Sequence, residues 1–291
     1  MGEQPGFDCP KAGNLFLEIT RFLKRSQPKA FLLENVPGLK TMTETYTHIV
    51  KALEVTGYDV STEVMSARGL TVTGRKRLFF VGLRRSRQDD DKVATKIFEF
   101  PFVPDLQLTF RDILDYDTLP AEELEILRLG ESTFNQLLTN KRTWRPSSLA
   151  WPNLKGDTLT SHYGNAVGRG ESQLVPCCSP HRPRRFSMRE MARCMGFPNV
   201  YEFLPIRERQ SPMAYRKENY RMIGNAVCPP LVAVLAGAVL DHCAVPPLKP
   251  NDKDEHHCDW VQQGRKVAVE LAMSVTRSEP VCVPRGCLVH A

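Results

Sequence analysis

The sequence lacks any apolar run long enough to cross a membrane, and it lacks the basic-then-apolar start of a secretory signal peptide. No internal repeat is evident either. These absences predict an intracellular protein without membrane contact, nuclear if the organism is a eukaryote and cytoplasmic if it is a bacterium. In that setting the nine cysteines of this 291-residue chain are expected to be reduced thiols.

The cysteines and histidines also lack the paired spacing of a zinc site, so we predict no metal ion. The groups that come nearest are Cys177-Cys178, His256-His257-Cys258, and Cys282 with Cys287 and His290. Free thiols are the simpler interpretation of all three.

What the chain does contain is the composition of an ordinary globular protein. Hydrophobic residues make up 42% and charged residues 25%, which suits one large or two modest domains. The net charge of +6 and the pI near 8.8 favour a polyanionic partner only weakly. Local motifs therefore carry most of the functional information.

The most informative stretch is Pro28–Gly38. Ala30–Leu33 is apolar without alternation, which is typical of a parallel strand covered on both faces. Glu34 and Asn35 follow at its carboxyl end, before a Pro-Gly pair breaks the strand. Because ligands bind outside the carboxyl ends of strands in open α/β sheets, Glu34 is a candidate site residue. Taken alone, a strand-end glutamate in a surface ion pair is the more common outcome.

Helices and strands alternate around this stretch, which predicts an α/β fold. Apolar residues at helical spacing predict helices over Asn14–Arg25 and Thr43–Glu54. Strands are predicted over Lys29–Val36, Tyr58–Val64 and Arg77–Leu83.

The character of the chain changes after residue 88. Residues 88–178 are rich in loop-forming residues and are interpreted as an insert in the α/β domain of residues 1–87. The α/β character returns over 179–245, where Ser187 and Glu190 form a capping box that opens a helix. A turn at Ile223–Pro230 then leads into an apolar helix, Leu231–Leu240. Residues 246–291 form a polar tail to which we assign no role.

Four motifs, in this order, resemble those of the DNA cytosine-5 methyltransferases, and the likeness covers residues 2–242. They are Phe31-Leu32-Leu33-Glu34-Asn35-Val36, Arg75-Lys76-Arg77-Leu78-Phe79, Arg185–Arg193 followed by Gly196-Phe197-Pro198, and Gly224-Asn225-Ala226-Val227. The resemblance implies an incomplete Rossmann-like fold that uses S-adenosylmethionine, with residues 88–178 as a target-recognition domain. It also implies DNA as the partner, with RNA less favoured.

The resemblance assigns roles to particular residues. In the family reaction a cysteine thiolate attacks C6 of a flipped-out cytosine, and C5 then takes the methyl group. By resemblance Glu34 protonates N3, Asn35 orients the site, Arg77 binds O2 and Arg75 is its structural neighbour. Glu34 would need burial to hold its proton near neutral pH. The arginines on their own would be interpreted as an exposed basic turn.

By the same resemblance Asn225, Ala226 and Val227 line the methionine end of the cofactor pocket. Without the other motifs, this segment would be interpreted as a turn that enters a helix.

Two family motifs are missing from these residues: the Gly-rich Phe-x-Gly-x-Gly turn and the Pro-Cys-Gln loop that carries the nucleophile. Cys9 lies past the position of that loop, and Thr73 stands where the family usually has glutamine. The chain therefore resembles the carboxyl-terminal portion of the family, with the last three strands of its sheet. We expect the strand Lys29–Val36 to lack a neighbour on one side, the isolated chain to be inactive, and a second chain to be a possible partner that supplies the missing half.

Two alternatives remain open at this point. One is a tRNA cytosine-5 methyltransferase, although that branch carries Cys-Phe-Thr where this chain has Thr158-Leu159-Thr160. The other is a non-catalytic remnant that binds nucleic acid, for which salt-dependent binding without methyl transfer would be the sign.

Overall fold

A computed structural model describes residues 15–85, 97–115, 118–139, 149–150, 154–164, 173–176 and 182–243. The expectations for Cys9, for Cys177 and Cys178, and for the tail beyond 246 lie outside these residues. The chain divides into two compact units. The first holds the described residues of Met1–Ser66, Lys76–Phe102 and Val234–Gly264, and the second holds those of Ala67–Arg75 and Val103–Ala233.

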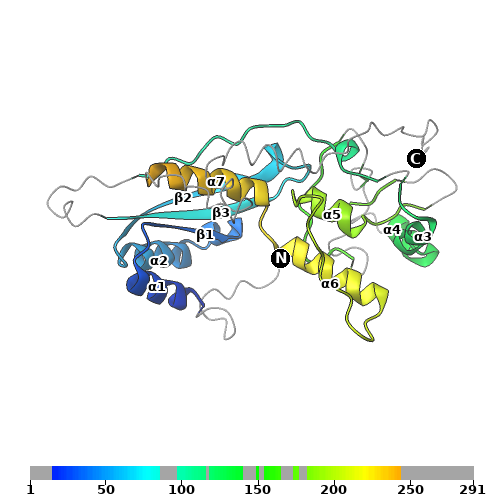
Figure 1. Cartoon of the computed structure of the whole chain (residues 1–291), viewed down its shortest axis with the longest axis horizontal. Helices are drawn as coiled ribbons and strands as arrows, with labels where there is room; N and C mark the ends of the chain where they lie inside the picture. Colours follow the sequence, from blue (N-terminus) through cyan, green and yellow to red (C-terminus); the bar gives the residue numbers. More distant parts are fainter. Residues whose placement is uncertain are drawn as a thin grey trace, which may run out of the picture. The chain divides into compact units, whose positions relative to one another are not determined.

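The first unit is built on a three-stranded sheet of β1 (Ala30–Asn35), β2 (Tyr58–Ser66) and β3 (Lys76–Arg84) in the order β1-β3-β2 (Figure 1). Both neighbours of β3 pair with it antiparallel. The prediction of a parallel first strand is therefore wrong for the pairing that the structure describes. The helix between β1 and β2 makes those two strands run the same way, but β3 enters between them without a helical crossover and so runs against both.

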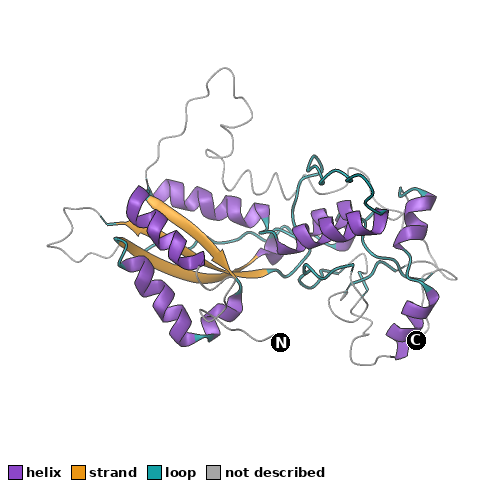
Figure 2. Cartoon of the chain, turned by 90° about the horizontal axis from the view of Figure 1, so that it is seen from below, coloured by secondary structure: helices purple, strands orange, loops and turns teal. Residues whose placement is uncertain are grey.

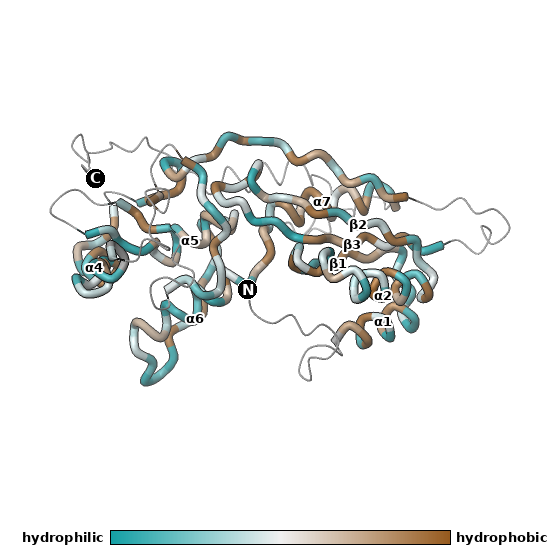
Figure 3. Tube along the Cα trace, turned by 180° about the vertical axis from the view of Figure 1, so that it is seen from behind, coloured by the Kyte–Doolittle hydropathy of each residue, from teal (hydrophilic) through white to brown (hydrophobic). Residues whose placement is uncertain are grey.

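Helices cover both faces of this sheet (Figure 2). On one face α1 (Leu15–Ser26) and α2 (Thr43–Glu54) bury Leu23, Ile49 and Leu53 against the strands. On the other face Val239 of α7 (Pro229–His242) joins Val81 and Leu83 of β3. Hydrophobic residues accordingly follow the strands and α7 in Figure 3. The mixed α/β class is confirmed, and the predicted helix Thr43–Glu54 has the observed bounds.

The short connection after β1 is a 3-10 helix, η2 (Pro37–Thr41), which begins at the predicted strand break. The β1 strand itself is only partly covered, because Leu32 and Leu33 are half-buried and Glu34 and Asn35 are exposed. Among the described residues β1 has a partner strand only on the β3 side. For the chain as a whole, the absence of a second neighbour stays a prediction.

Gly82 of β3 lies against the ring of Phe31, and a β-carbon at this position would overlap the ring. We expect Gly82→Ala to lower the free energy of unfolding by about 1–3 kcal/mol, because overpacking forces the ring or the strand to shift. Urea denaturation measures the change. Gly130→Ala is the control, since Gly130 is exposed and nothing lies near an added β-carbon there. Equal effects of the two substitutions would contradict the packing argument.

The second unit contains two 3-10 turns and several short helices, with part of α7. They are η3 (Ala67–Gly69), η4 (Phe110–Asp112), α3 (Ala121–Leu127), α4 (Glu131–Thr139), α5 (Met188–Cys194) and α6 (Pro212–Asn225). Its core gathers aromatic and aliphatic side chains such as Phe110, Tyr163, Phe186 and Tyr220. The predicted capping box of Ser187 and Glu190 opens α5.

The helix α6 is absent from the sequence predictions. Ser211 caps it and Pro212 is its first residue, a start signal that the sequence contained. Because α6 continues to Asn225, the turn predicted at Ile223–Pro230 shrinks to the three residues before α7. The compact units also divide the segment predicted as 179–245, since its described residues up to Ala233 belong to the second unit.

The stretch Pro212–His242 is apolar enough to resemble a membrane span, with a mean hydropathy of 1.9 in its most apolar window. It consists of two helices, and α7 has 14 residues. At 1.5 Å per residue α7 is about 21 Å long, shorter than a hydrocarbon core of about 30 Å. Val234 and Leu235 of α7 are buried. We therefore interpret α7 as a core helix.

Candidate active-site residues

An ion pair joins the end of β1 to the start of β3. The Nε atom of Arg77 lies 2.7 Å from Oε1 of Glu34, and the two side chains are 16% and 30% exposed. Strand register explains the contact, because Glu34 is opposite Phe79 and Arg77 precedes Phe79 by two residues on the same face. The structure thus brings together the two residues that the sequence predicts as the acid and its arginine.

The electrostatics of this pair are governed by partial burial. Burial lowers the pKa of Arg77, and the adjacent Glu34 carboxylate partly offsets that effect. An arginine in this setting still carries its charge at neutral pH. The burial expected for Glu34 is not found in the described residues, because the outer edge of β1 is uncovered. A ligand that binds the Glu34 carboxyl must displace or share the Arg77 contact.

Asn35 stabilises the turn that follows the strand. Its Oδ1 atom accepts a hydrogen bond from the N–H of Val36 at 2.8 Å. The side chain is exposed and fixes the chain at the entry to η2. This geometry suits the orienting role predicted for Asn35.

Arg75 belongs to the second unit, whereas Glu34, Asn35 and Arg77 belong to the first. It is 2% exposed, and its Nη1 atom donates to the carbonyl oxygen of Leu159 at 3.3 Å. Its neighbour Thr73 is also buried and donates to the carbonyl oxygen of Cys194 at 3.0 Å. Arg75 therefore ties its own segment to the loop at Leu159, which is a structural task.

The predicted cofactor residues lie in the second unit, where Asn225 is the last residue of α6 and Ala226 and Val227 begin the short connection to α7. Asn225 is exposed, and Ala226 and Val227 are half-buried. Ala226 is extended (φ −66°, ψ 161°), and its N–H bonds back to Met222 and Ile223. The exposed amide of Asn225 can donate to and accept from a polar ligand. The described residues contain no Gly-rich turn for the rest of S-adenosylmethionine.

The cysteines of the described residues do not provide a thiolate nucleophile. Cys194 and Cys228 are buried, and burial raises the pKa of both thiols, that of Cys228 to about 12. Thiols with raised pKa values are poor nucleophiles at neutral pH. Cys243 is half-buried and free.

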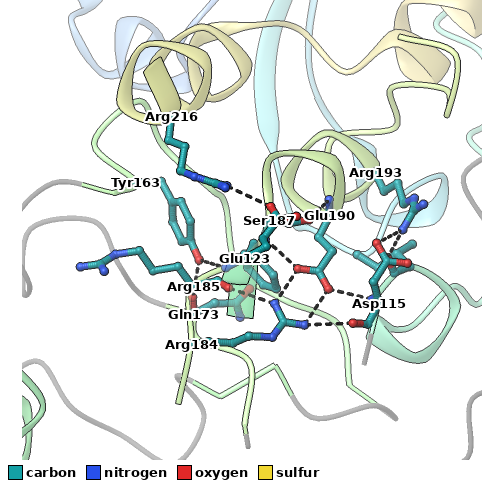
Figure 4. A network of polar contacts seen from close by, with 12 residues as sticks. Asp115, Glu123, Tyr163, Gln173, Arg184, Arg185, Ser187, Glu190, Arg193 and Arg216 are labelled. Atoms are coloured by element: carbon teal, nitrogen blue, oxygen red, sulfur yellow. Dashed lines mark hydrogen bonds and ion pairs between the residues drawn. The ribbon is translucent and has the colours of Figure 1, made fainter. Parts of the chain in front are cut away.

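A buried carboxylate organises the second unit (Figure 4). Glu190 is fully buried and pairs with Arg184 at 2.7 and 2.8 Å. Its two oxygens also accept from the N–H groups of Asp115 and Ser187, each at 2.7 Å. Glu190 therefore joins the start of α5 to two other segments of the chain. The sequence showed only its contact with Ser187, through the capping box.

Comparison with known proteins decides the family. The family model for C-5 cytosine-specific DNA methylases matches residues 1–241. The chain belongs to this family. The match includes every residue predicted for the catalytic and cofactor sites.

Curated relatives agree with this assignment. The chain is 30% identical over 253 residues to the type II methyltransferase M1.ScrFI of Lactococcus lactis subsp. cremoris, covering 82% of this chain and 58% of that protein. It is 31% identical over 250 residues to the type II methyltransferase M.BsuFI of Bacillus subtilis, covering 82% of this chain and 54% of that protein. The chain thus spans little more than half the length of these two relatives.

Solved structures show the same methyltransferase fold. The crystal structure of S. pombe Dnmt2 methyltransferase matches with a TM-score of 0.58 and 21% identity, over 83% of this chain and 75% of that one. The Entamoeba histolytica methyltransferase EhMeth matches with a TM-score of 0.58 and 16% identity, over 81% of this chain and 70% of that one.

Proposed function

We propose that this chain supplies the base-protonating residues and the methionine-end loop of an enzyme that methylates C5 of cytosine in DNA. The observation that carries the proposal is the contact of Glu34 with Arg77 at 2.7 Å, at the edge of the sheet where the family motifs fall. The carboxyl of Glu34 protonates N3 of the base, and the guanidinium of Arg77 binds O2. Asn35 holds the turn that presents Glu34, and Arg75 secures the neighbouring segment from within the core.

The described residues fit part of the cofactor. S-adenosylmethionine supplies the methyl group when it is bound, and the loop of Asn225, Ala226 and Val227 contacts its methionine end. These 291 residues include neither the Gly-rich turn nor the Pro-Cys-Gln loop. We infer that a thiolate from such a loop forms the covalent adduct at C6 of the base. The chain in isolation is then inactive until another segment or a second chain provides that loop.

Among the described residues no strand pairs with the outer edge of β1, which supports the need for such a segment. An edge strand with half-buried apolar residues favours pairing with another strand. Residues 88–178 are proposed as the target-recognition domain. We propose that the protein acts in the cytoplasm if the organism is a bacterium and in the nucleus if it is a eukaryote, because DNA is found there.

The test compares two proteins in a tritiated-methyl transfer assay on duplex DNA. One consists of these 291 residues, and the other joins them to an amino-terminal segment that carries the Phe-x-Gly-x-Gly turn and the Pro-Cys-Gln loop of the family. We expect transfer only by the joined protein, with the label on C5 of cytosine. Transfer by the 291 residues alone would overturn the proposed need for a second segment.

A joined protein that folds cooperatively, binds S-adenosylmethionine and still transfers nothing to DNA would overturn the proposed activity. Transfer to a tRNA transcript but not to DNA would replace the substrate. Calorimetry of cofactor binding separates the two causes of inactivity: a joined protein that binds S-adenosylmethionine is folded, and one that does not bind it can be misfolded.

A further inference from the structure

The exposed side of α6 carries a row of side chains spaced four residues apart. They are Met213, Lys217, Arg221 and Asn225, and all are exposed. Residues at this spacing lie one above another on one face of a helix. The row therefore runs along α6 and ends at Asn225, the first residue of the proposed cofactor loop.

The carboxylate of α6 does not neutralise this row. Glu218 is the one acidic residue of the helix. Its Oε1 atom accepts from Arg207 at 2.9 Å and its Oε2 atom from Gln210 at 3.0 Å. Glu218 is thus engaged with the turn that precedes the helix.

Two cations of the row are left uncompensated. Arg216, the third cation of α6, pairs with Glu123 of α3 at 3.0 Å. Lys217 and Arg221 have no ion pair within the part of the chain that the structure describes. Like charges four residues apart destabilise a helix, and an anionic ligand removes that repulsion.

A loop with hydroxyl groups lies against the same end of α6. A β-carbon at Gly224 would overlap the carbonyl group of Thr160 and the backbone nitrogen of Ser161, so helix and loop are in close contact. Thr160 and Ser161 are half-buried, and His162 is exposed. The Thr160 hydroxyl accepts from the N–H of His162 at 3.3 Å, which leaves its proton available to donate. Hydroxyl groups beside cations are typical contacts of nucleic-acid phosphates.

We propose that Lys217, Arg221 and the Thr160–His162 loop bind the phosphate backbone of duplex DNA and align it with the cofactor loop. Lys217 and Arg221 are about 6 Å apart along the helix axis. This separation spans about two phosphates of one strand, at about 3.4 Å of duplex axis per phosphate. The proposal rests on the proposed function for the identity of the nucleic acid, and it adds a contact surface to it.

The test measures binding of the 291-residue chain to a labelled DNA duplex at several salt concentrations, without cofactor. For the double variant Lys217→Ala with Arg221→Ala we expect the slope of log K against log salt to become shallower by about 1.8, since each phosphate that a cation neutralises contributes about 0.9. The matched control is Lys24→Ala with Arg25→Ala, since both residues are exposed in the last turn of α1. The control is expected to keep the wild-type slope.

The charge-retaining variant Lys217→Arg with Arg221→Lys is expected to keep the slope as well. The proposal would be overturned if the alanine variant had the same slope as wild type and also the same thermal unfolding. A slope change seen with a tRNA transcript but not with DNA would also overturn it. Binding is measured separately from methyl transfer. If the joined protein transfers no methyl group but the alanine variant still shows the shallower slope, the proposed function is contradicted and the proposed phosphate contacts are not.

Discussion

Glu190→Ala is expected to lower the free energy of unfolding by about 3–5 kcal/mol, the range for breaking one side of a buried ion pair. The substitution leaves the Arg184 charge in the core without its carboxylate. It also removes the acceptor for the N–H groups of Asp115 and Ser187. Chemical denaturation of the full chain, followed by near-ultraviolet circular dichroism, measures the loss.

Glu125→Ala is the matched control for this prediction. Glu125 pairs with Arg128 at the same distance of 2.7 Å and in the same unit, but its side chain is 69% exposed. Exposed pairs contribute about 0–1 kcal/mol, so this variant should stay close to wild type. A Glu190→Ala variant as stable as the control would show that the buried network does not organise the unit.

The same carboxyl gives a pH dependence with a defined sign. Burial raises the pKa of Glu190, but the Arg184 charge and the hydrogen bonds lower it more, so the pKa lies below its ordinary value. Stabilisation by such a group is complete above the unfolded pKa of about 4.3 and is lost as the pH falls through the lowered value. The stability gap between wild type and Glu190→Ala should therefore shrink in acid, and a gap that widens would contradict this assignment.

Glu34→Gln is expected to lower kcat of the joined methyltransferase by about 10²–10⁴-fold, the usual contribution of a general acid. Glutamine keeps the shape and can accept from Arg77, but it cannot deliver a proton to N3. The dissociation constant for DNA should change little, because the proton transfer belongs to the chemical step. Single-turnover methyl transfer at saturating DNA measures the effect.

The sheet offers a closely matched control, Glu63→Gln. Glu34 of β1 and Glu63 of β2 are both paired with Phe79 of β3, one on each side. Glu63 is exposed and belongs to no family motif. Equal losses of kcat in the two variants would contradict the catalytic role of Glu34. A loss of DNA affinity large enough to explain the slower reaction of Glu34→Gln would contradict it as well.

Local pattern was a good guide where local forces decide the structure. The apolar spacing of Thr43–Glu54 predicted α2, and the Ser187–Glu190 pair predicted the start of α5, because helix faces and caps depend on neighbours within one or two turns. It failed for β1, which was predicted as a parallel strand and pairs antiparallel with β3. Strand direction depends on the route of the connection, and residues 67–75 return the chain through a short connection whose one helical element is the three-residue 3-10 helix η3.

The candidate site divides in the same way. The motifs identified Glu34 and Arg77 by type and order, but the register of β1 with β3 decided that they touch. By resemblance the Arg-x-Arg motif gave Arg77 the base contact and made Arg75 its structural neighbour, but the structure was needed to show that Arg75 is buried and that Arg77 contacts Glu34. The exposed row on α6 was missed because Lys217 and Arg221 are informative only after Arg207 and Glu123 have been found to engage the nearby charges.

Residue type and spacing along the chain were enough to predict the α/β class and the helices with clear apolar faces, and the resemblance of four motifs indicated the family and the residues proposed for the chemistry. The folded chain was needed for the antiparallel place of β3, the contact of Glu34 with Arg77 and the burial of Arg75 and Glu190. It was also needed to find the cations of α6 that lack an ion pair among the described residues. These features depend on which distant segments meet, and chain entropy, strand register and burial decide that together.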